Sequence, residues 1–96
     1  MTEPTLHDVS DTARWVAHYR ALESQRPDAL FVDSLASRLA GDTGRQMAEH
    51  MPKVSLSWAI AVRARVYDEL ILDAIERDRA TAVVNIAAGM DARPYR

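Results

Sequence analysis

The residues whose types and spacing best fit a binding or chemical role lie at the end of the chain, in the sequence VVNIAAGMDARPYR at Val83–Arg96. A short apolar run leads into Gly89, and Asp91 and Arg93 follow it. In α/β folds, a buried strand that opens into a loop of small residues presents backbone N–H groups to a nucleotide-like ligand. Glycine permits a positive φ and a close approach of the backbone. The pattern therefore predicts a ligand-binding loop, with an ordinary turn as the alternative.

The elements before this loop are predicted to be helical. Ser10 or Asp11 can cap a first helix that Pro27 ends. A second helix or helix pair is predicted over 28–41, with Asp33 as a cap inside it and Gly41 as its stop. Residues 42–51 can add a turn or two of helix.

The strongest helix is predicted over Ser55–Asp78, where Trp58, Val62, Val66 and Leu70 recur every four residues. The period then disappears. Residues 81–87 form a short apolar run rich in β-branched side chains, which is typical of a buried parallel strand. The chain is thus expected to be mostly α, with three to four helices and one strand.

Composition excludes several classes of protein. The net charge of −2 argues against a general affinity for nucleic acid or anionic membranes. The absence of cysteine excludes disulfides and thiolate metal sites, and the three histidines have no metal-ligand spacing. Neither a signal peptide nor an apolar run of membrane-spanning length is present, so a soluble cytoplasmic protein is expected.

The string NIAAGMDARPYR resembles the first motif of bacterial S-adenosylmethionine-dependent methyltransferases related to leucine carboxyl methyltransferase. The residues that fit this motif are Gly89, Met90, Asp91, Arg93, Tyr95 and Arg96. Two upstream segments, 12–41 and 62–75, resemble the family's helical cap and the helix before its first strand. Ala87 and Ala92 depart from the motif, because Gly and Thr or Ser are usual at those positions.

The resemblance implies S-adenosyl-L-methionine as cofactor, with Ala88, Gly89 and Asp91 at its site. It also implies that Arg65 grips the cofactor's carboxylate, a task that suits the bidentate guanidinium fork. Arg63, two residues away and on a different face of the helix, is the competing candidate for this task. Two further alternatives remain open. Arg63 and Arg65 can be solvated arginines that pair with Asp68 or Glu69, and Asp91 can cap a following helix with Arg93 paired to it.

By the same resemblance, residues 1–54 form a helical cap, and residues 55–96 form the first helix, strand and cofactor loop of an incomplete Rossmann-like domain. The expected function is that of an N-terminal fragment of an O-methyltransferase, inactive alone, whose acceptor is the carboxylate or hydroxyl of a small molecule. Catalytic residues are not identified. An orphan strand and an unpartnered helix stripe favour a homo-oligomer. A free-standing helical interaction module is the alternative, and a DNA regulator is disfavoured by the charge.

Overall fold

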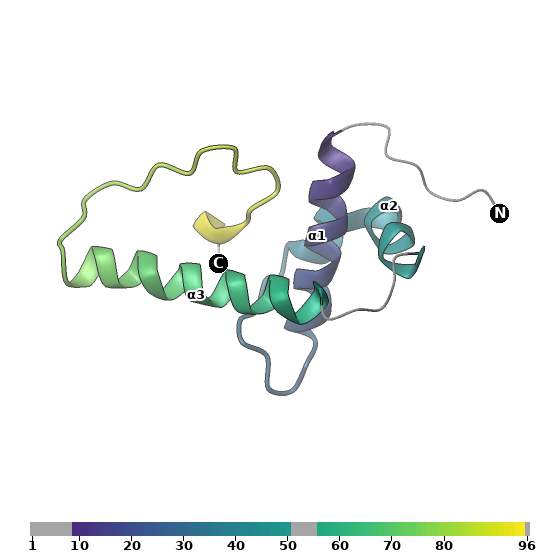
Figure 1. Ribbon diagram of the computed structural model, residues 1–96, viewed down its shortest axis with the longest axis horizontal. Helices are drawn as coiled ribbons and strands as arrows, with labels where there is room; N and C mark the ends of the chain where they lie inside the picture. The colour runs from purple at the N-terminus through teal and green to yellow at the C-terminus, as the bar shows by residue number, and fades with distance from the viewer. Residues whose placement is uncertain (1–8, 51–55, 96) are drawn as a thin grey trace.

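The computed structural model describes residues 9–50 and 56–95. Within them lie three α-helices, α1 (Val9–Ser24), α2 (Ala36–His50) and α3 (Leu56–Glu76), and the short 3-10 helix η1 (Arg93–Tyr95). Helices α1 and α2 pack together, α3 extends away from them, and the chain after α3 arcs back toward α1 (Figure 1). The helical character expected from the sequence is therefore confirmed for this part of the chain.

Helices α1 and α2 make the most extensive contact between elements of this structure. Most of their buried apolar side chains are alanines, and Tyr19 and Met47 are the larger ones; the alanines are Ala17, Ala21, Ala36 and Ala40. At the contact, a Cβ added to Gly44 would clash with the carbonyl oxygen of Arg14. Small side chains thus let the two helix backbones approach closely, and only glycine fits at position 44.

The helix ends differ from the sequence prediction in detail. Helix α1 begins at Val9, so Ser10 and Asp11 lie in its first turn instead of capping it. It ends at Ser24, just before Pro27, as predicted. The second helix begins only at Ala36, where Asp33 caps it by accepting a 3.1 Å bond from the Leu35 amide. Gly41 (φ 59°, ψ −164°) has a non-helical backbone that divides α2 into two helical pieces, so the stop predicted at this glycine is confirmed and further helix follows it, as predicted.

Helix α3 confirms the long helix that the sequence predicted, apart from Ser55, which lies outside the described residues. One face meets the rest of the fold, where Ala61 and Ala64 pack against Phe31. The stripe of four apolar residues lies outside that buried face, and its side chains are 39% to 60% exposed; they are Trp58, Val62, Val66 and Leu70. No other described segment covers this stripe. Among the described residues no helix is long and apolar enough to cross a membrane.

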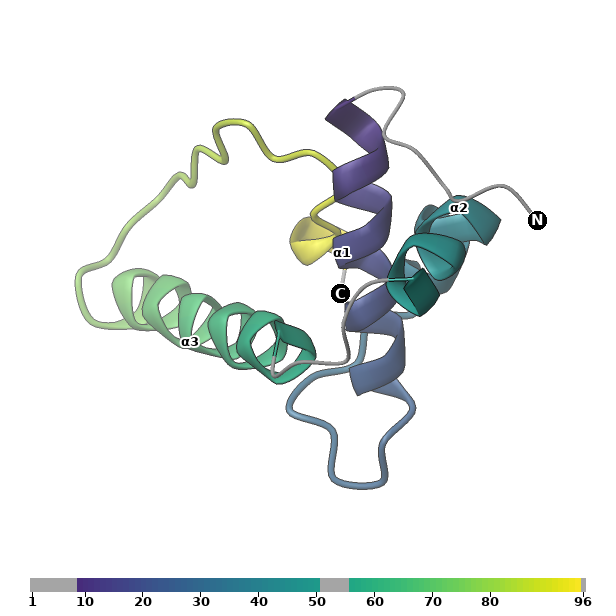
Figure 2. The same ribbon diagram turned by 45° about the vertical axis from the view of Figure 1, so that its right-hand side comes forward.

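The prediction of a strand over 81–87 is wrong, because the structure has no strand there. Residues 79–85 have no regular secondary structure, and the apolar side chains Val83, Val84 and Ile86 are 58% to 85% exposed. A strand requires ladder hydrogen bonds to a neighbour, and no described segment pairs with this one. The view in Figure 2 shows the segment as a wide arc, apart from the helices over most of its length. The Rossmann-like sheet stays a prediction.

The Gly44 contact predicts a test of stability. Gly44→Ala places a methyl group against the Arg14 backbone and forces α1 and α2 apart. We expect the free energy of unfolding to fall by about 1–3 kcal/mol, the usual range for overpacking. Urea denaturation followed by circular dichroism measures it, with Thr43→Ala on the exposed side of α2 as the control. Equal unfolding midpoints for the two variants would contradict the close contact.

The exposed face of α3 predicts self-association, and we propose a second copy of the chain as its occupant. Arg63 and Arg65 lie in the first half of α3, whereas the second half carries four acids: Asp68, Glu69, Asp73 and Glu76. An antiparallel pair of α3 helices would place opposite charges together while burying the stripe. Sedimentation velocity at low micromolar concentration should show a dimer or larger species.

Matched substitutions test which surface associates. Val66→Asp in the stripe should weaken association at least about tenfold, because it removes apolar burial worth more than 1.4 kcal/mol. Val32→Asp is the control, since Val32 is 66% exposed in the loop between α1 and α2. A monomer at all concentrations, or equal weakening by both variants, would refute the α3 interface.

Candidate functional site

The predicted ligand loop forms a tight turn that returns the chain to the helices. Ala87 and Gly89 both have positive φ, 53° and 56°. The amide of Asp91 donates to the carbonyl oxygen of Ala88 at 3.0 Å, and η1 follows directly. Glycine adopts this backbone conformation without strain, whereas Ala87 stores some. A Cβ on Gly89 would lie 3.6 Å from the Cβ of Ala13, so the turn sits against the start of α1.

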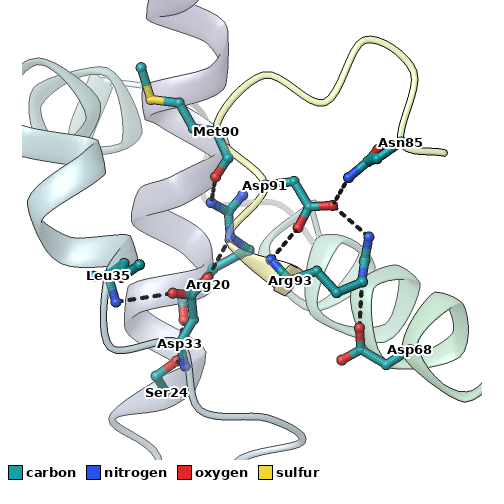
Figure 3. Close-up of polar contacts among 9 residues, drawn as sticks. All are labelled: Arg20, Ser24, Asp33, Leu35, Asp68, Asn85, Met90, Asp91 and Arg93. Atoms are coloured by element: carbon teal, nitrogen blue, oxygen red, sulfur yellow. Dashed lines mark hydrogen bonds and ion pairs between the residues drawn. The ribbon is translucent and has the colours of Figure 1, made fainter. Parts of the chain in front are cut away.

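Asp91 organises the loop through three hydrogen bonds. Its carboxylate accepts from the side-chain amide of Asn85 at 2.9 Å, from the backbone amide of Arg93 at 2.9 Å and from the Arg93 guanidinium at 2.6 Å (Figure 3). The alternative that Asp91 caps a following helix and pairs with Arg93 is thus confirmed. A contact between Asp91 and a cofactor stays a prediction.

Two arginines fasten this loop to the helices from opposite sides. Arg93, within η1, donates through Nε to Asp68 of α3 at 2.6 Å. Arg20, from α1, donates through Nη2 to the carbonyl oxygen of Met90 at 2.5 Å. The same guanidinium holds Asp33 through Nε at 3.1 Å, as Figure 3 shows. Loop position therefore depends on both α1 and α3.

Arg65 lies outside this network. It donates to Glu69 one helical turn away at 2.9 Å and to the carbonyl oxygen of Leu30 at 2.5 Å. Its side chain is 48% exposed, so its guanidinium remains accessible to a ligand. Arg63 instead lies over the ring of Tyr67, at 5.5 Å from the centroid. The pairing of Arg65 with Glu69 matches one alternative from the sequence, and the contact with a cofactor carboxylate stays a prediction.

The sequence reasoning missed Arg20 and Asp68 as members of the site. Arg20 is 70 positions from Met90, and Asp68 is 25 positions from Arg93. No local spacing in the sequence predicts such contacts, because they form only when the chain after α3 folds back onto α1 and α3. The capping role predicted for Asp33 is confirmed, whereas its ion pair with Arg20 has no local sequence signal. Among the described residues, no group of three or more His, Asp or Glu side chains could hold a metal ion.

Comparison of the sequence with known protein families finds a match. The sequence profile described as "Leucine carboxyl methyltransferase" matches residues 13–96, which include both arginine ties and the whole loop. The chain belongs to the leucine carboxyl methyltransferase family. The resemblance seen in the sequence is thereby confirmed. No solved structure matches the chain at a significant level.

The curated proteins to which the chain is similar carry provisional names. A Streptomyces coelicolor protein, provisionally named an S-adenosyl-L-methionine-dependent methyltransferase, is 36% identical over 88% of this chain and 33% of its own length. A Mycobacteroides abscessus protein with the same provisional name is 37% identical over 92% of this chain and 31% of its own length. The chain thus spans about a third of the length of these relatives.

The Asp91 network predicts a local change when it is removed. Asp91→Ala deletes an acceptor of three bonds, one of them from the Arg93 amide. Hydrogen exchange at that amide should accelerate about tenfold or more, since a bond to a charged group is worth about 1.5–3 kcal/mol. Mass spectrometry or NMR measures it. Glu69→Ala, which removes an exposed acid of α3, is the control and should leave this amide unchanged.

Proposed function

We propose that the chain provides the N-terminal portion of an S-adenosyl-L-methionine-dependent methyltransferase, including the first part of its cofactor site. One observation carries the proposal: the family-matched segment folds into a glycine turn that is fastened to two helices. A turn held in one conformation can present its backbone to a ligand without first being ordered. The relatives' names supply the cofactor.

In this proposal the backbone at Ala88 and Gly89 lies against the cofactor, and Arg65 binds its carboxylate. Leaving Glu69 costs Arg65 little, because an exposed ion pair contributes only about 0–1 kcal/mol. The Asp91 carboxylate has about four lone-pair sites and uses three of them within the loop. One site remains for a cofactor group, so Asp91 can orient the loop and contact the ligand together.

The reaction we propose is O-methylation of a small molecule. The methyl group on a sulfonium is electrophilic, and a carboxylate or hydroxyl of the acceptor attacks it in line. Catalysis then consists of positioning and, for a hydroxyl, removal of its proton. The residues of this chain position the cofactor. The acceptor would be bound by the part of the fold that the relatives have in addition.

A chimera tests the proposal. Residues 13–96 replace the matching N-terminal region of the Streptomyces coelicolor relative, and calorimetry measures binding of S-adenosyl-L-methionine. We expect micromolar binding by the chimera. We expect neither binding at that level nor methyl transfer from labelled cofactor by the 96-residue chain, because most of the contact surface is outside it. A folded chimera that fails to bind would refute the proposal.

Two arginine variants of the chimera assign the carboxylate contact. Arg65→Ala should weaken cofactor binding about tenfold or more, since a charge-assisted bond is worth about 1.5–3 kcal/mol. Arg63→Ala is the matched control, two positions away on the same helix and stacked on Tyr67. Equal effects of the two substitutions would remove Arg65 from the site while leaving the proposed function in place. A free-standing helical module without catalysis would show no cofactor binding in any form.

A further inference from the structure

A buried ion pair lies between the helices and the loop. The Arg20 and Asp33 side chains are only 10% and 1% exposed, and their Nε–Oδ2 distance is 3.1 Å. A charge pair this deeply buried is a weak source of stability, because desolvation offsets the attraction between its members. A second hydrogen bond of Arg20, to the loop, indicates a role in positioning that loop. The far end of the Arg20 guanidinium reaches the Met90 carbonyl oxygen, directly after Gly89 in the turn.

We propose that Arg20 is a positioning residue for the Gly89 turn, acting from a helix outside the loop motif. This inference rests on the proposed function, because the turn that Arg20 holds is the proposed cofactor loop. The guanidinium fork makes both contacts at once, Nε to Asp33 and Nη2 to Met90. Lysine presents a single ammonium on a flexible stem and cannot reproduce this fixed geometry.

Asp33 orients the Arg20 guanidinium, because both the backbone and the carboxylate of Asp33 are held by hydrogen bonds. Its amide donates to the Ser24 hydroxyl oxygen at 2.8 Å, and its Oδ1 accepts from the Leu35 amide at 3.1 Å. The Ser24 hydroxyl in turn donates to the carbonyl oxygen of Arg20 at 2.8 Å. The end of α1 and the start of α2 thereby orient one carboxylate oxygen toward Arg20. The packed helix pair thus determines where the turn lies (Figure 3).

The consequence is that the helical cap contributes to the cofactor site without touching the cofactor. Arg93 ties the loop only to α3, through Asp68. Without Arg20, the turn keeps that tie, its internal bond between Asp91 and Ala88 and its position beside Ala13, but it loses its hydrogen bond to α1 and, through Asp33, its connection to the start of α2. The turn should then sample several positions, and cofactor binding would have to order it first.

The first experiment uses the 96-residue chain. The reporter is hydrogen exchange at the Asp91 amide, which is bonded to Ala88 within the turn. Arg20→Lys and Asp33→Asn should each accelerate this exchange about tenfold. Asparagine keeps the cap on α2 but removes the charge, which leaves the buried Arg20 guanidinium without its carboxylate. The Arg77 amide at the end of α3 should be unchanged, because it belongs to another helix.

Arg26→Gln is the matched control, since it removes an exposed arginine that pairs with Glu23 and Asp28. It should leave the Asp91 amide unchanged. Unchanged exchange at Asp91 in both Arg20→Lys and Asp33→Asn would overturn the proposal. Equal acceleration at Asp91 and Arg77 would also overturn it, because the pair would then support overall stability and not loop position.

The second experiment uses the chimera and separates this inference from the proposed function. Arg20→Lys should weaken binding of S-adenosyl-L-methionine about tenfold at an unchanged melting temperature of the unliganded protein. Full affinity in this variant would refute the positioning role and leave the cofactor site intact. If the unsubstituted chimera fails to bind, the proposed function fails, and exchange at Asp91 still decides whether Arg20 holds the turn.

Discussion

The ion pair between Arg20 and Asp33 is the interaction on which the arrangement of this chain depends. It joins the end of α1, the cap of α2 and the loop after α3 in one buried place. Each of these segments has few large apolar contacts of its own, since the α1–α2 core is mostly alanine. Directional polar contacts therefore specify where the segments lie, while the small side chains permit the close approach.

Helix α3 has one side that packs against the rest of the fold and another that is exposed. Its inner face is narrow, with Ala61 and Ala64 against Phe31, and Asp68 reaches Arg93 from the same helix. Its exposed surface carries the apolar stripe together with charged side chains. A helix that is apolar on a solvent-facing side carries surface that association or further packing would remove from water.

The loop itself shows how a motif can be stable in shape without a sheet beneath it. The apolar run at Val83, Val84 and Ile86 is extended and exposed, yet the turn that follows is held by Asp91 and by two arginine ties. The polar residues of the motif thus have a local structural role. Asp91 and Arg93 pair with each other, and Arg93 also binds Asp68, without a ligand.

The sequence by itself determined the helices, the turn and the family. Periodic apolar residues predicted α3, Pro27 marked the end of α1, and the string after Ile86 identified the leucine carboxyl methyltransferase family. These are properties of neighbouring residues, so they can be read along the chain. The strand at 81–87 was mispredicted because a strand requires a partner, which its own sequence does not supply. The tie from Arg20 to Met90 was decided only by tertiary structure, since it joins positions 70 residues apart through the packing of three helices.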